Sequence, residues 1–362
     1  MIGNRRLRPI GLSLPFLWLI LPLLLLGGCA GAPVRPQPPL PPPVQLPLPS
    51  PPQVQIPPPP QTYAKLFPEF VAVIAQPGDT FSSLAGKYLN EPSLDWLISE
   101  FNDSESLSPG QELIIPLKLP EKGGLTFQGY QMIPVLTYHK FSKNKSDNMT
   151  VTEKAFEEQM RFLKQQGYRV ISMNEFFNFL ELKSPIPKKS VVITIDDGWR
   201  STYEIAFPIL KKYGYPATLF VYTDLISPND ETLGWDLIRK MAQGGIDVQG
   251  HTKTHRKLER SGQESLREFF EAVKRELTES AKIIKRHLNK DVQYLAYPYG
   301  DTNTLVIALL MRLGYRGAFT VERGSNPFFT HPHRLKRSMI YGHFDLQDFE
   351  KNLTYFSDEA LR

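Results

Sequence analysis

The spacing of hydrophobic residues changes along the chain, and from Met132 onward two spacings alternate. Short apolar runs rich in β-branched residues are separated by longer stretches in which apolar residues recur every three or four positions. The short runs predict strands at 133–138, 169–172, 191–195, 217–222, 246–249, 292–296, 317–321 and 335–340. The longer stretches predict helices at 153–166, 174–182, 203–213, 235–243, 265–288 and 302–313. This alternation favours a parallel α/β sheet, and eight such units suit a (β/α) barrel.

A smaller unit precedes this region. Residues 71–75 and 111–116 read as strands, and residues 80–88 and 93–101 as helices between them, with Thr80 as the helix cap. The βααβ order resembles a LysM domain, which we expect over 69–119, because P-G-D-T stands near the start, Asn102 follows the second helix and S-P-G-Q-E-L-I-I-P ends the unit.

The LysM resemblance implies binding to glycans that contain N-acetylglucosamine, such as peptidoglycan or chitin. In that family the glycan lies between the first turn and the loop before the last strand. Here the loop is 103–107, and the residues of the turn are Gly78, Asp79, Thr80 and Phe81. The alternative is a small domain that has lost glycan binding.

The N-terminus has the pattern of an export signal. Three arginines, at positions 5, 6 and 8, precede an apolar run over 9–26, and L-G-G-C follows. The small residues directly before Cys29 resemble a bacterial lipobox, which implies that 1–28 is a lipoprotein signal peptide and that Cys29 carries lipid. We therefore expect an exported protein that is lipid-anchored in the cell envelope, at the outer membrane facing the periplasm if the source is Gram-negative. The alternative is an uncleaved membrane anchor.

Residues 29–62 are rich in proline and nearly free of charge. Such a segment favours an extended polyproline II linker, with a reach on the order of 100 Å. The formal net charge of the chain is +5, and the three N-terminal arginines contribute three of these charges, so the charge does not argue for a nucleic-acid partner. Cys29 is the only cysteine, which excludes an intramolecular disulfide.

Polar residues directly follow four of the predicted strands. These stretches are Y-H at 138–139, D-D-G at 196–198, H-T-K-T-H at 251–255 and Y-P-Y-G at 297–300. The carboxyl ends of parallel barrel strands meet on one face, and that face carries the active site. We therefore expect the four stretches to converge.

Two of these stretches together predict a metal centre. His251 and His255 are four residues apart, which on a helical turn places both on one side. With Asp197 they make two imidazoles and one carboxylate, a common catalytic zinc set, and Asp196 is then free to act as a base. The Tyr299 N–H is a candidate oxyanion donor. The alternatives are a solvated Asp-Asp-Gly turn, two surface histidines and an ordinary proline turn.

The motifs T-I-D-D-G, H-T-K-T-H and A-Y-P-Y-G, in this order, look like the polysaccharide deacetylase family, also called the NodB homology domain or carbohydrate esterase family 4. The resemblance covers about 128–362. It implies an irregular (β/α) barrel of seven or eight strands, Asp196 as general base, and a divalent metal, with zinc the first candidate, on Asp197, His251 and His255. The residues expected to line the substrate or the oxyanion are Trp199, Tyr297, Pro298, Tyr299 and Gly300.

Two positions depart from the family pattern. Ala296 stands where the family usually has an arginine that orients the base, and the late Leu-x-His motif that supplies a general acid has no clear match. Instead a strand at the front of the domain ends in His139. This order resembles the poly-N-acetylglucosamine deacetylase subgroup, in which the motifs are circularly permuted, and implies that His139 is the acid. The alternative is a packed histidine or one that only supports the site.

The sequence thus predicts a metal-dependent N-deacetylase acting on N-acetylglucosamine units of peptidoglycan or poly-N-acetylglucosamine. Two alternatives remain open. One is an envelope lipoprotein that binds glycan without catalysis. The other is an O-acetyl esterase that uses the same site.

Overall fold

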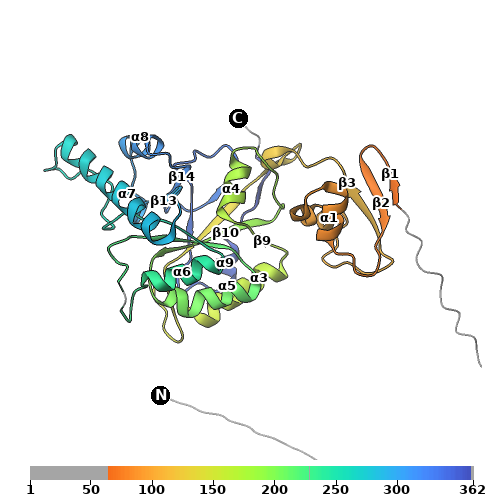
Figure 1. Ribbon diagram of the computed structural model, residues 1–362, viewed down its shortest axis with the longest axis horizontal. Coiled ribbons are helices and arrows are strands. Elements are labelled where there is room, and N and C mark those ends of the chain that lie inside the picture. Colours follow the sequence, from red (N-terminus) through yellow and green to blue (C-terminus); the bar gives the residue numbers. More distant parts are fainter. Residues whose placement is uncertain (1–63, 228, 360–362) are drawn as a thin grey trace, which may run out of the picture. The chain divides into compact units, whose positions relative to one another are not determined.

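The structure is a computed structural model, and it describes residues 64–227 and 229–359 (Figure 1). The predicted signal peptide, the proline-rich linker and Cys29 lie outside these residues. Among the helices of the described part, none is both long and apolar enough to cross a membrane.

The small unit has the predicted strand–helix–helix–strand order. Strand β2 (Phe70–Ile74) leads to α1 (Phe81–Leu89) and α2 (Asp95–Phe101), and β3 (Glu112–Pro116) closes the unit beside β2. Strand β1 (Ala64–Leu66) adds a third, antiparallel strand that the hydrophobic pattern did not predict. Alternate residues of β2 and β3 are buried, as expected for strands with one face on a core, and they pack against the helices through Val71, Val73, Leu113, Ile115, Leu84 and Ile98.

One side chain joins α2 to β3 in this unit. The Asn102 Nδ2 atom donates to the carbonyls of Ile98, at 2.8 Å, and Ile114, at 2.7 Å. The Ile114 N–H donates back to Asn102 Oδ1 at 2.8 Å. Asn102 therefore satisfies backbone groups of both elements and fixes the helix end against the strand.

The larger region is built on a nine-stranded sheet with the order β14-β13-β12-β11-β10-β6-β15, to which β9 and β16 add through β10 and β6. Within the described residues β15 (Ser325–Asn326) pairs antiparallel, and the other pairs of this sheet are parallel. The parallel strands are β6 (Ile133–Tyr138), β9 (Arg169–Val170), β10 (Ser190–Asp197), β11 (Ala217–Val221), β12 (Ile246–Gly250), β13 (Tyr294–Ala296), β14 (Gly317–Phe319) and β16 (Ser338–Met339).

Residues 335–339 join the two sides of the curled sheet. The Leu335 N–H donates to the Ala318 carbonyl at 3.0 Å, beside β14, and the Thr320 N–H donates to the Leu335 carbonyl at 2.8 Å. Further along the same segment, Ser338 and Met339 pair with β6. This bridging confirms the predicted irregular (β/α) barrel.

The two faces of β10 pack against different surroundings. Val191, Ile193 and Ile195 belong to the core under the outer helices. Val192 belongs to a separate cluster that fills the barrel interior. Because side chains alternate along a strand, Thr194 and Asp196 share the interior side with Val192.

The helices cover the outside of the sheet (Figure 1). Helix α4 contributes phenylalanines to the interior cluster. The helices of this region are α3 (Glu153–Gln165), α4 (Met173–Leu180), α5 (Phe207–Tyr213), α6 (Trp235–Gln243), α7 (Leu266–Leu288), α8 (Thr304–Arg312) and α9 (Leu346–Glu350). Short strands that the pattern did not predict are β4 (Leu125–Thr126), β5 (Gly129–Gln131), β7 (Lys140–Ser142), β8 (Thr150–Thr152) and β17 (Phe356–Ser357).

We predict that Asn102→Ala loosens the small unit by about 2 kcal/mol, because backbone groups of α2 and β3 lose their partners. Hydrogen exchange followed by mass spectrometry should show faster exchange over 95–116. Exchange in β10 should stay unchanged. Ser106→Ala, at an exposed position in the same loop, is the control. Equal protection in both variants would contradict the role of Asn102.

Candidate active site

The four polar stretches predicted from the sequence lie at the carboxyl ends of neighbouring strands. Asp196 and Asp197 are the last residues of β10, and His139 directly follows β6, which pairs with β10. His251 directly follows β12, and Tyr297 follows β13, the next strand. The expected convergence is therefore observed.

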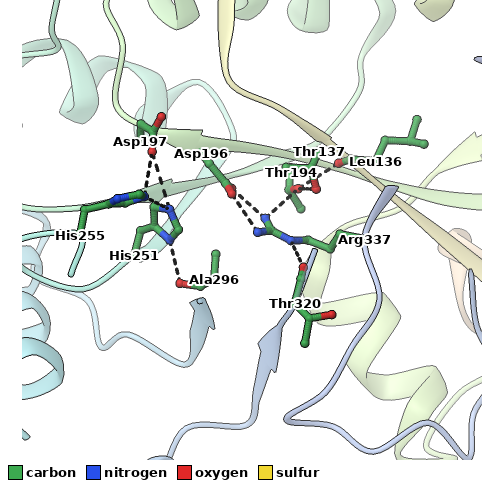
Figure 2. Close-up of polar contacts among 10 residues, drawn as sticks. All are labelled: Leu136, Thr137, Thr194, Asp196, Asp197, His251, His255, Ala296, Thr320 and Arg337. Carbon is green, nitrogen blue, oxygen red and sulfur yellow. Dashed lines mark hydrogen bonds and ion pairs between the residues drawn. The ribbon is translucent and has the colours of Figure 1, made fainter. Parts of the chain in front are cut away.

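Asp197, His251 and His255 form a cluster whose ligand atoms all lie within 4.8 Å of one another (Figure 2). Asp197 Oδ1 is 3.6 Å from the Nε2 atom of each histidine. The two Nε2 atoms are 3.1 Å apart. Three donor atoms thus face one small volume.

The chemistry of His251 fits a metal ligand. Its Nδ1 lies 2.7 Å from the Ala296 carbonyl oxygen, which can only accept, so Nδ1 carries the proton and Nε2 presents a lone pair to the cluster. Burial lowers the pKa of His251 to about 4, so the ring is neutral near pH 7. A neutral imidazole is the form that binds metal. The donor set of two imidazoles and a carboxylate therefore suits a divalent cation.

The prediction of a helical turn at His251 and His255 is wrong. Residues 251–255 form a bent loop in which Thr252 and His255 have left-handed φ angles of 68° and 63°. Buried Glu276 of α7 holds this loop: its Oε2 accepts the N–H groups of Lys253 and Thr254 at 2.9 and 2.8 Å. The carboxylate thus fixes a strained backbone, and nothing in the local sequence pointed to it.

Trp199 supports Asp197 directly. Its Nε1–H donates to Asp197 Oδ2 at 2.8 Å, which leaves Oδ1 to face the histidines. The ammonium of Lys140 lies 3.5 Å from the centre of the Trp199 ring and so covers one face of it. The structure thus gives Trp199 a contact with the proposed ligand, in addition to the sugar-lining role expected from the sequence.

Asp196 points into the barrel interior and meets Arg337 there (Figure 2). The Arg337 Nη1 and Nη2 atoms donate to Asp196 Oδ1 and Oδ2, both at 2.8 Å, and both side chains are almost completely buried. Burial favours the neutral acid, but the charge of Arg337 and its hydrogen bonds lower the pKa of Asp196 below its ordinary value. Sequence reasoning missed Arg337, since no motif surrounds it. The sequence pointed to it only indirectly, because Ala296 stands where the family pattern has an arginine and Asp196 therefore needs another partner.

His139 is partly buried beside the two carboxylates. Burial lowers the pKa of its imidazole, and the negative charges of Asp196 and Asp197 act in the opposite direction. The structure thus places His139 within the electrostatic reach of both aspartates. Its role as general acid remains a prediction.

The residues of the Y-P-Y-G stretch occupy different environments. Tyr297 is fully buried and its hydroxyl donates to the His333 carbonyl at 2.9 Å, so it packs the core and does not line a groove. Pro298 is also buried. Gly300 has a φ of 81°, and an added Cβ would lie 2.5 Å from Val321 Cγ2. Tyr299 alone is 57% exposed, with its ring against that of His255 at 4.8 Å between centres.

In the small unit, backbone hydrogen bonds join Ala75, which precedes the expected glycan-binding turn, to Gly110 and Gln111, which follow the expected loop 103–107. The Ala75 N–H donates to the Gln111 carbonyl at 2.9 Å, and the Gly110 N–H donates to the Ala75 carbonyl at 2.8 Å. The turn that follows has Gly78 at a φ of 93°. Asp79 accepts the Gln76 N–H at 2.7 Å, and Thr80 caps α1, which Phe81 begins. Asp79 and Thr80 therefore also shape the turn.

Comparison with known proteins identifies the domain that carries the site. Residues 183–318 match the family model described as polysaccharide deacetylase. YxkH of Bacillus subtilis (strain 168) is 31% identical over 193 residues, a match that covers 53% of this chain and 66% of that protein. The poly-beta-1,6-N-acetyl-D-glucosamine N-deacetylase of Staphylococcus aureus (strain MRSA252) is 30% identical over 189 residues, covering 50% of this chain and 65% of that protein. The chain thus spans just under two thirds of these relatives.

Solved structures show the same fold. The Streptococcus pyogenes deacetylase PplD, in complex with acetate, matches with a TM-score of 0.55 and 27% identity over 61% of this chain and 98% of that one. IcaB from Ammonifex degensii matches with a TM-score of 0.53 and 25% identity over 59% of this chain and 94% of that one.

We predict that Trp199→Phe weakens zinc binding about 10- to 100-fold, because Asp197 loses the donor that orients it. Isothermal titration of the metal-free protein measures this directly. Trp235→Phe, which alters a ring stacked on His287, should leave the affinity unchanged. An unchanged affinity in Trp199→Phe would show that Asp197 does not need this hydrogen bond.

We also predict that Glu276→Ala weakens zinc binding by about tenfold or more, because the loop that carries His255 loses three hydrogen bonds. Competition with a chromophoric chelator gives the affinity. Glu279→Ala, on the same helix and paired with Lys282, is the matched control. Equal affinities in the two variants would contradict the role of Glu276.

Proposed function

We propose that this chain, which carries a polysaccharide deacetylase domain, is a metal-dependent hydrolase that removes acetyl groups from N-acetylglucosamine units of a cell-envelope polysaccharide. The observation that carries this proposal is the separation of the two neighbouring aspartates. Asp197 faces two histidines, whereas Asp196 is held as an anion by Arg337. One carboxylate is thus equipped to bind a cation, and the other to accept a proton.

Asp197, His251 and His255 would hold the metal, and zinc is our first candidate for this set. When bound, such a cation polarises a carbonyl group and makes water more acidic. Asp196 accepts a proton from the water molecule whose oxygen attacks the acetyl carbon. The Tyr299 N–H donates to the oxyanion that develops on the carbonyl oxygen.

The leaving group is the sugar amine. We propose that His139 donates a proton to this nitrogen as the C–N bond breaks. The products are then acetate and a glucosamine unit. Exposed Tyr299, at the rim beside His255, presents a flat ring to the apolar face of a sugar.

The proposed substrate is peptidoglycan or poly-N-acetylglucosamine. The name of the Staphylococcus aureus relative supports the second of these. The resemblance of the small unit to a LysM domain supports glycan binding at Gly78, Asp79, Thr80 and Phe81. We further propose that the protein is exported and lipid-anchored at Cys29, which would keep both units near an envelope polysaccharide.

We predict that the full-length protein in detergent, supplied with zinc, releases acetate from these glycans. Asp196→Asn and His139→Ala should each lower the rate about 10²- to 10⁴-fold, because each removes a proton-transfer group. His287→Ala, at a ring stacked on Trp235, should keep the wild-type rate. Enzymatic acetate determination measures all four proteins, and zinc content is checked in each.

The outcomes separate the alternatives. Acetate from N-acetylated glycans that is lost in Asp196→Asn supports the proposal, and the better substrate identifies the glycan. Acetate from O-acetylated substrates alone would indicate an esterase. Zinc-loaded protein that binds glycan and releases no acetate would indicate a binding lipoprotein and contradict the proposal.

A further inference from the structure

Arg337 is a buried cation that comes from the segment bridging the two sides of the barrel. Its side chain is 0% exposed. The guanidinium lies beside the neighbouring rings of Phe220 and Phe319, with Cζ 5.5 and 5.9 Å from the ring centres. Two nitrogens contact Asp196, and Nε donates to the Thr320 carbonyl at 3.0 Å. Arg337 also lies outside the stretch 183–318 that matches the family model.

Ala296 borders the same part of the interior. Its side chain belongs to the cluster that contains Phe220 and Phe319, the two rings beside Arg337. Ala296 also pairs in register with Phe319 across β13 and β14. A longer side chain at 296 would therefore extend into the space that the guanidinium occupies. The backbone of the same residue holds His251 through its carbonyl (Figure 2).

From this arrangement we infer that Arg337 is the positioning residue for Asp196. In this chain it supplies from residues 335–339 the guanidinium that the resembling family supplies from position 296, and the small side chain of Ala296 leaves room for it. The inference rests on the proposed role of Asp196 as the base.

The geometry explains why a guanidinium is needed. Two parallel N–H···O bonds of 2.8 Å fix the plane of a carboxylate as well as its position. A lysine offers a point charge and cannot fix that plane. A positioned base matters because a displacement of about 1 Å can cost on the order of 10²-fold in rate.

A contribution to folding stability does not by itself explain the ion pair between Arg337 and Asp196. Replacing a buried ion pair by apolar residues of similar volume is often neutral or stabilising. The rings of Phe220 and Phe319 already make part of the surroundings of Arg337 apolar. The ion pair costs desolvation in this interior, and a function in holding Asp196 explains its presence.

The test moves the arginine from position 337 to position 296. In Arg337→Met we expect kcat to fall about 10²-fold, KM to stay within about twofold, and zinc affinity to be unchanged, because the three proposed ligands are not touched. Adding Ala296→Arg to Arg337→Met should restore kcat by about tenfold or more. Adding Ala296→Met instead, which matches the chain length without the charge, should restore nothing.

Arg337→Lys keeps a positive charge beside Asp196, so it tests the positioning role even if Arg337→Met fails to fold. We expect this variant to fold, to bind zinc and to lose about tenfold in kcat. A wild-type kcat in Arg337→Lys would overturn the positioning role. A folded, zinc-loaded Ala296→Arg/Arg337→Met variant no more active than Ala296→Met/Arg337→Met would overturn the shared-space argument. If the wild type itself releases no acetate, the proposed function fails. That result differs from the two outcomes above, which contradict only the role of Arg337.

Discussion

The end of β10 is the constraint on which the site depends. Side chains alternate between the two buried faces of the strand as far as Asp196, and Asp197 leaves this alternation with a left-handed φ of 78°. Asp196 follows Val192 and Thr194 into the barrel interior, whereas Asp197 lies at the outer end beside the histidines. Two adjacent carboxylates that would otherwise repel each other thus receive separate partners. The separate roles of a base and a ligand therefore start from the point where the regular strand ends.

Supporting contacts then fix each partner in one orientation. Trp199 holds Asp197, the Ala296 carbonyl holds His251, and Glu276 holds the loop before His255. The backbone is strained at the same place, since Asp197, Thr252, His255 and Tyr299 all have left-handed φ angles. Strain of this kind persists only where the surroundings over-determine the conformation, which the supporting hydrogen bonds do here.

Much of the fold could be predicted because its signals are local. Apolar runs and helical periods gave β6 and α6 their observed bounds, and the convergence of Asp197, His251 and His255 followed from strand ends alone. Arg337 and Glu276 could not be found in this way, because each acts on a residue far away in the sequence and sits in no motif. The left-handed loop at His255 was missed for a related reason, since helical spacing and a bent loop bring the same two histidines together.

The charges of the site also bear on how it would stabilise the oxyanion of the proposed reaction. Arg337 neutralises Asp196, and burial keeps His251 uncharged, so Asp197 carries the one uncompensated charge among these four groups. A divalent cation on this set would leave a net single positive charge where the acetyl oxygen becomes negative in the reaction. Without Arg337 the charge of Asp196 would also be uncompensated, and it would oppose the negative charge that develops on the acetyl oxygen. The arginine therefore contributes to the balance of charge as well as to the position of the base.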